Sequence, residues 1–271
     1  GTSESRNFSR RKDPESSSFL HVLRRGLPTG KQGLCRATRH SFGHHTESAV
    51  HGRVVPEKGI HSQFEVGANP TDDAHKGQSI EDSERMVGNH DDTNAFSEAF
   101  PDTPRDTSNF VQTGFDTLYG RLLLLDTKEP GTHAGAYCDA RSAWLRHELA
   151  FSNGPIILFM HHPPFKTGIA SMDKIMLQNA EGFYDVIAPY KSRIRHLFFG
   201  HVHRAIFGNW RGISYSCMRG LNHQVALDLS GDESRISGQF ESPAYGVVLL
   251  SDDQITVHLH DFMDPSERFF L

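Results

Sequence analysis

Residues 155–164 read Pro155-Ile156-Ile157-Leu158-Phe159-Met160-His161-His162-Pro163-Pro164, and this stretch decides the fold. Five apolar residues in a row predict a buried strand at 156–160, opened by a proline and ended by His161. Two prolines directly after the histidine pair indicate a turn at the end of that strand. The sequence therefore places two histidines at a strand end, where a loop can direct them into a site.

The sequence on either side of this strand alternates between strand and helix patterns. Residues 122–125 form a second buried apolar run that ends at Asp126, and residues 194–199 are predicted as the next strand, which ends at Gly200-His201. Helical spacing of apolar residues covers 140–151 and 172–190. Further strands are predicted at 205–207, 213–217, 225–229, 245–250 and 255–260. This order predicts an α/β sandwich of two mixed β-sheets flanked by helices.

Composition narrows the class of protein. The 271 residues carry 28 Lys and Arg against 33 Asp and Glu, so no basic nucleic-acid face is expected. The three cysteines contain no CxxC pair, which favours a reducing compartment, and we expect a cytoplasmic protein. No apolar run approaches the roughly 20 residues needed to cross a bilayer, and no signal peptide is expected. The 18 histidines are unusual, because histidine is the commonest metal ligand.

The chain has two unlike parts that meet near Met86. Residues 1–85 are rich in Arg, Ser, His and Gly, and their one clear apolar cluster is 19–23. So few apolar residues cannot bury enough surface to offset chain entropy, which predicts a disordered or poorly packed segment. Residues 86–271 have the composition of a folded domain. The predicted organisation is thus an atypical N-terminal segment, 1–85, followed by one domain, 86–271.

Three short histidine motifs follow strand-like runs in the second part. They are Gly88-Asn89-His90-Asp91, His161-His162-Pro163-Pro164 and Gly200-His201-Val202-His203. Imidazole nitrogens and amide or carboxylate oxygens suit Zn, Fe and Mn. A single histidine at a strand end is more often structural, but three motifs in this order predict a metal site. In Gly-His-x-His, the glycine is expected to permit a strained turn.

In this order the motifs resemble the class III cyclic nucleotide phosphodiesterase branch of the calcineurin-like metallophosphoesterases, over about residues 86–265. Shorter stretches support the resemblance: Leu125-Asp126-Thr127, Pro130-Gly131, Ala143-Trp144-Leu145 and His223-Gln224-Val225. The resemblance implies two divalent metal ions, Fe, Mn or Zn. It makes Asn89, His161 and His201 ligands of the second metal and His203 a ligand of the first. His90 becomes the acid for the leaving oxygen, oriented by Asp91, and His162 and His223 lie near the substrate.

The resemblance also implies a function, namely a hydrolase that cleaves a small phosphodiester by attack of metal-bound hydroxide. A 3′,5′-cyclic nucleotide is the first expected substrate and a glycerophosphodiester the second, and a phosphomonoester is a further possibility. Neither a nucleic-acid polymer nor a membrane is an expected partner. The branch often forms dimers, so a homodimer is expected.

The sequence departs from the family at its N-terminal side. The family has an Asp-x-His and a Gly-Asp-x-x-Asp whose carboxylates hold the first metal and bridge the two. Residues 1–85 contain only Asp73-Ala74-His75, which follows no apolar strand. Without a bridging carboxylate two dications would repel strongly, so one metal is the most that this site should hold. Three alternatives stay open: a frameshifted or mis-assigned N-terminus before an active domain, a catalytically impaired relative that binds metal or phosphate, and a structural protein with surface histidines.

Overall fold

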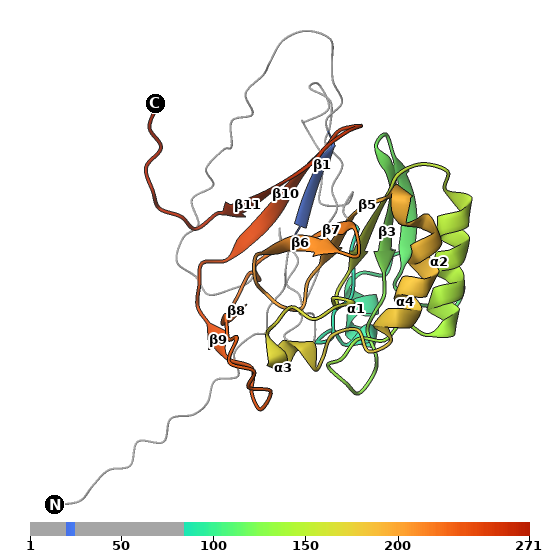
Figure 1. The fold of residues 1–271 in the computed structure, drawn as a ribbon, viewed down its shortest axis with the longest axis horizontal. Helices are drawn as coiled ribbons and strands as arrows, with labels where there is room; N and C mark the ends of the chain where they lie inside the picture. The colour runs from blue at the N-terminus through green and yellow to red at the C-terminus, as the bar shows by residue number, and fades with distance from the viewer. Residues whose placement is uncertain (1–19, 25–83) are drawn as a thin grey trace, which may run out of the picture.

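The computed structural model of the chain describes residues 20–24, as backbone alone, and residues 84–271. Most of the predicted atypical segment 1–85, including Asp73-Ala74-His75, lies outside the described residues. Within that segment the structure contains strand β1, Leu20–Arg24, which coincides with the apolar cluster noted in the sequence (Figure 1). Whether 1–85 is disordered or frameshifted stays a prediction.

A six-stranded sheet forms the centre of the domain. Its order is β2-β3-β4-β5-β7-β6. The four inner strands run parallel, and the outer two run antiparallel to their neighbours. The strands are β2 (Thr113–Thr117), β3 (Gly120–Leu125), β4 (Ile156–Met160), β5 (Ile194–Phe199), β6 (Ile206–Trp210) and β7 (Ile213–Cys217). Because β4 lies inside the sheet and is buried on both faces, its side chains form a continuous apolar run.

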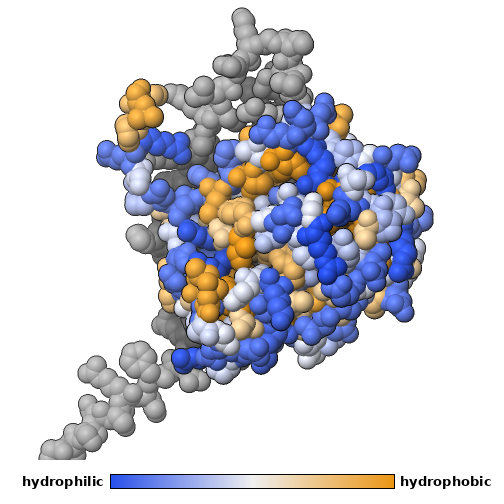
Figure 2. Space-filling model, in the orientation of Figure 1, coloured by the Kyte–Doolittle hydropathy of each residue, from blue (hydrophilic) through white to orange (hydrophobic). Residues whose placement is uncertain are grey.

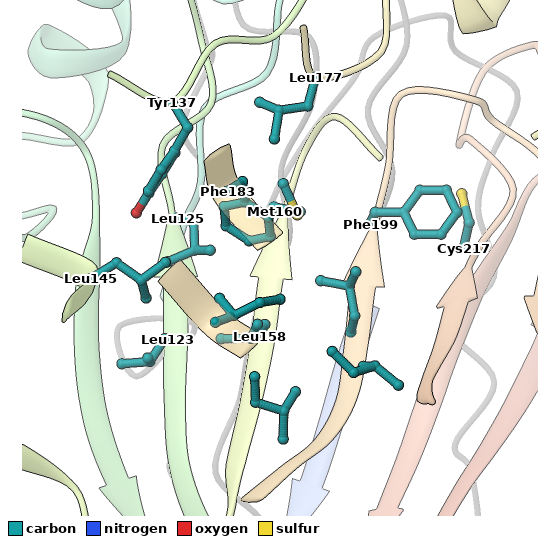
Figure 3. Packing of buried hydrophobic residues seen from close by; sticks show 14 of the residues in the cluster. Leu123, Leu125, Tyr137, Leu145, Leu158, Met160, Leu177, Phe183, Phe199 and Cys217 are labelled. Carbon is teal, nitrogen blue, oxygen red and sulfur yellow. The ribbon is translucent and has the colours of Figure 1, made fainter. Parts of the chain in front are cut away.

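Alternate residues of each inner strand enter different cores, as the two-residue period of a strand requires. Leu123, Leu158 and Phe199 pack against helices α2 (Asp139–Phe151) and α4 (Ala180–Ile187), as Figure 3 shows in part. Leu124 and Phe159 point the other way, into a second core. Full burial of such side chains contributes about 1.5–3 kcal/mol each, so both faces of the sheet stabilise the fold.

The second core is closed by a smaller sheet of order β1-β10-β11. Strand β10 (Ala244–Leu250) pairs parallel with β1 and antiparallel with β11 (Ile255–Asp261). A two-stranded ribbon, β8 (Gln224–Val225) and β9 (Gly238–Gln239), stands apart from both sheets in the hydrogen-bonding pattern. The predicted α/β sandwich of two mixed sheets is confirmed. In Figure 1 the helices α2 and α4 cover the outer side of the larger sheet.

The predicted helix over 172–190 is wrong as one element. The structure has α3 (Ala170–Asp173), α4 and the 3-10 helix η2 (Ala188–Arg193). The segment between α3 and α4 leaves the helical path because its backbone bonds elsewhere. Gln178 N–H donates to the carbonyl of Gly135, and Gly135 N–H donates to that of Met176. Tertiary hydrogen bonds therefore override the apolar spacing.

Other differences are smaller. The predicted strand at 225–229 is limited to β8, which ends at Val225. Strand β2 and helix α1 (Thr93–Ala99) were not predicted, and α1 begins at an Asp92 cap whose carboxylate accepts from two backbone N–H groups. In the described part of the chain no helix is long and apolar enough to cross a membrane. The apolar C-terminal residues 269–271 are exposed and stand away from the body (Figure 2).

Candidate metal centre

Parallel strands carry two of the three histidine motifs to one edge of the central sheet. Strands β4 and β5 end at Met160 and Phe199, directly before His161 and Gly200, and β3 ends beside them at Leu125. The motif Gly88-Asn89-His90-Asp91 instead forms a turn before α1, and no strand directly precedes it among the described residues. Parallel strands bring their carboxyl ends together, which is where open α/β sheets place their sites. In Figure 1 this edge lies toward α1 and α3.

Three side chains that the sequence predicted as ligands of one metal meet at this edge. Asn89 Oδ1 lies 2.8 Å from His161 Nε2, and His161 Nε2 lies 3.2 Å from His201 Nδ1. Ligands on a tetrahedral metal with bonds of about 2.0–2.1 Å stand roughly 3.3 Å apart, so this spacing fits one shared ion. Both histidines are buried. Among the described residues His201 Nε2 is buried without a hydrogen-bond partner.

Burial keeps these imidazoles neutral. Loss of water, followed by the charges of neighbouring histidines, lowers the pKa of His161 and of His201 well below 6.5. Burial also lowers the pKa of His203 to about 4. A neutral imidazole offers a lone pair, whereas the protonated form does not. The donor set near neutral pH is therefore chemically suited to a divalent metal.

His162 belongs to the same cluster but is already fully bonded. Its ligand atoms lie within 4.8 Å of those of His161 and His201. However, Thr127 Oγ1 donates to its Nδ1 at 2.8 Å, and its Nε2 donates to the carbonyl of His133 at 3.1 Å. A carbonyl oxygen can only accept, so Nε2 carries the proton, and Nδ1 of the neutral ring must accept from Thr127. Thr127 Oγ1 also accepts from the His162 backbone N–H at 3.3 Å. Both ring nitrogens are used within the protein, so contact of His162 with the substrate stays a prediction.

The Gly-His-x-His turn is strained, but not at its glycine. His201 and His203 have φ of 64° and 48°, whereas Gly200 is not in the left-handed region. A non-glycine residue in this region costs about 1–2 kcal/mol. The expectation that Gly200 takes up the strain is therefore wrong. Gly200 instead ties β5 to β4, because its N–H donates to the carbonyl of His161 at 3.0 Å.

The remaining predicted residues surround this cluster. The His203 ring lies 5.2 Å from that of His223, and His203 also packs closely against the backbone of Gly220. Asp91 is buried and accepts from Gly88 N–H at 2.6 Å, which closes the turn that presents His90. Their roles as first-metal ligand, substrate contact and leaving-group acid stay predictions.

No carboxylate joins the three-histidine cluster in the part of the chain that the structure describes. The nearby buried Asp126 instead bonds to the backbone, accepting from Val111 and Lys128 N–H groups, and burial raises its pKa. The candidate metal donors among the described residues are therefore all neutral, and they bring no negative charge to offset that of a metal ion.

The sequence did not indicate His133, which the structure brings to the site. Its Nδ1 lies 3.2 Å from Asn89 Nδ2, and its ring lies 5.0 Å from that of His90. It follows the Pro130-Gly131 pair in an irregular loop. No periodic pattern reaches such a loop, so proximity in the fold was the only signal.

Comparisons with known proteins identify sequence relatives of this chain. No protein-family model matches the chain. It is 44% identical over 190 residues, 69% of both chains, to a probable cyclic nucleotide phosphodiesterase of Rhodopseudomonas palustris. It is 30% identical over 177 residues, 64% of both chains, to a probable glycerophosphodiester phosphodiesterase of Arcobacter nitrofigilis. About a third of each relative lies outside the match.

Among solved structures, a dimetal phosphatase from Danio rerio aligns with 49% of this chain and 59% of its own, at 14% identity and a TM-score of 0.41. That likeness is too distant to support an argument. The sequence match to the Rhodopseudomonas palustris relative is sufficient to assign the family. The chain belongs to the cyclic nucleotide phosphodiesterase branch of the calcineurin-like metallophosphoesterases.

Proposed function

We propose that this protein is a metal-dependent phosphodiesterase that hydrolyses a small phosphodiester. The observation that supports it most is the convergence of Asn89 Oδ1, His161 Nε2 and His201 Nδ1 at 2.8 and 3.2 Å in a buried site. A divalent ion held there, iron, manganese or zinc, would polarise a phosphoryl oxygen and lower the pKa of a water molecule. The protein's part is to hold the donors neutral and to position the substrate.

His90 is proposed to protonate the leaving oxygen. His90 lies in the turn between Asn89 and Asp91, so it directly follows a proposed metal ligand in the sequence. The Asp91 carboxylate holds this turn through Gly88 N–H. General acid catalysis of this kind contributes typically 10²–10⁴-fold, about 3–5 kcal/mol. His203 is proposed as a ligand of a first metal, and His162 and His223 as neighbours of the substrate.

A 3′,5′-cyclic nucleotide is the proposed substrate, because the more similar of the two relatives is named a probable cyclic nucleotide phosphodiesterase. A glycerophosphodiester is the second choice, after the name of the other relative. Comparing kcat/KM for a 3′,5′-cyclic nucleotide and for a glycerophosphodiester under equal metal loading would decide between them. Higher kcat/KM for the glycerophosphodiester would reverse the order.

The all-neutral donor set favours a second candidate function, a relative that binds one metal or phosphate without turnover. Three neutral ligands leave the charge of a second nearby ion uncompensated. A cytoplasmic location and a homodimer stay predictions from composition and family.

Metal stoichiometry and turnover separate the two candidates. The protein would be loaded with Mn²⁺, freed of excess metal and assayed with bis(p-nitrophenyl) phosphate. Two metals per chain and turnover that is lost in His201→Ala would support the phosphodiesterase. At most one metal, with no turnover above that of His201→Ala, would support the impaired relative. A chain that binds neither Mn²⁺ nor inorganic phosphate would refute both and revive a purely structural role.

A further inference from the structure

We propose that His133 is a positioning residue that turns the Asn89 side chain so that its oxygen, not its nitrogen, faces the metal donors. The inference rests on the proposed function, since it assigns a role at the same site. The two ends of an amide differ chemically. The oxygen has lone pairs that a metal can use, whereas the NH₂ group only donates hydrogen bonds.

The contacts of Asn89 explain how the amide is held in one orientation. Its Nδ2 lies 3.2 Å from His133 Nδ1, and its Oδ1 lies 2.8 Å from His161 Nε2. Because the NH₂ group must donate, His133 Nδ1 must accept, and its proton is then on Nε2. A flipped amide would place oxygen against this lone pair and nitrogen against the metal donors. The first contact would be repulsive, and the NH₂ group could not bind a metal held by the same donors.

His133 is exposed, so the loop around it must be held by other groups. His162 Nε2 donates to its carbonyl oxygen at 3.1 Å. The buried Arg141 donates to the carbonyls of Ala136 and Lys128 at 2.9 and 2.6 Å. The loop is thus fixed on both sides of His133, and its ring needs little ordering to bond Asn89.

His162 helps to hold His133 in place. Its two nitrogens join Thr127, at the end of β3, to the backbone of His133. A hydrogen-bonded path therefore runs from the end of a buried strand, through His162 and His133, to the amide oxygen in the donor cluster. Partners that orient a metal ligand in this way typically change metal affinity by about 10- to 100-fold.

The test is the affinity of the purified chain for Zn²⁺, measured by competition with a chromogenic chelator. His133→Ala should raise the Kd for Zn²⁺ by about 10- to 100-fold. His133→Asn should restore most of the affinity, because its side-chain oxygen occupies the place of Nδ1 and accepts from the Asn89 amide. Since His133 is exposed, neither change should prevent folding.

A double-mutant comparison makes the test specific to amide orientation. Asn89→Asp replaces the amide by a carboxylate whose two oxygens are equivalent, so no orienting partner is needed. In that background, His133→Ala should change the Kd for Zn²⁺ by less than about tenfold. Equal affinity of His133→Ala and the parent would overturn the inference while the proposed function stands, and so would an undiminished effect in Asn89→Asp. Failure of the parent to bind Zn²⁺ would overturn both.

Discussion

His196 should make the protein less stable as the pH falls below about 6.5. This histidine lies on β5 and faces the second core, 7% exposed. Its Nε2 lies 2.9 Å from Ser216 Oγ on β7, and its ring centroid lies 4.3 Å from that of Phe198. Burial lowers the pKa of His196 from 6.5 to about 4. Arg195 and Asp253 are the charged residues that line the same cavity.

The size of the effect follows from linkage. In the unfolded chain the ring takes a proton near pH 6.5, whereas in the folded chain it stays neutral to about pH 4. Between these values the unfolded state binds more protons, so the free energy of unfolding falls as the pH falls. The difference between these two pKa values, at about 1.4 kcal/mol per pH unit, corresponds to about 3 kcal/mol of the free energy of unfolding. About 2 kcal/mol of this should be lost by pH 5.

Urea unfolding of the parent and of His196→Gln, from about pH 7.5 to pH 5, measures this contribution. Glutamine places an amide near Ser216 but does not titrate, so the variant should lose about 2 kcal/mol less than the parent over this range. Ser216→Ala is the control, because it removes the hydrogen bond and keeps the titrating ring. It should lower stability at every pH without changing the slope. Parallel curves for the parent and His196→Gln would refute the reasoning.

Two further predictions concern packing and a buried ion pair. Gly135→Ala would place a Cβ 2.5 Å from the ring carbon of His162, so it should destabilise the fold by about 1–3 kcal/mol in urea unfolding. An unchanged midpoint would show that this loop can move aside. Glu148→Ala should destabilise by about 3–5 kcal/mol, because Arg121 would lose its buried partner at 2.5 Å. Asp116→Asn, at the exposed end of the same guanidinium, should lower the free energy of unfolding by only about 0–1 kcal/mol. Equal losses in these two variants would contradict the burial argument.

Strands were predictable from the sequence where burial decides the residue type. The strands predicted at 156–160 and 194–199 match β4 and β5 residue for residue. Inner strands buried on both faces favour apolar side chains, as all of β4 shows, although β5 also includes Arg195 and His196. Strand β2 has the sequence TGFDT and lies at the edge of the sheet, where no such constraint acts. The helix expected at 172–190 does not form as one element, because the segment before α4 makes backbone hydrogen bonds with Gly135.

The candidate site was also only partly predictable from the sequence. Asn89, His161 and His201 could be named as candidates because their motifs resemble those of the family, and the fold brings their side chains together. The details that decide chemistry could not be predicted. The amide orientation depends on His133, 44 residues away in a loop. The strain on His201 depends on how the turn closes against β4.

The left-handed backbone at His201 and His203 sets stability and function against each other during evolution. Glycine, and to a lesser extent asparagine, accept such φ angles more readily than histidine does. A lineage selected only for a stable fold should drift toward these residues at both positions. A lineage that keeps two histidines there retains a less stable turn at each generation. Histidine at 201 and 203 therefore carries a conformational cost relative to glycine, which the proposed role of both side chains as metal ligands would explain.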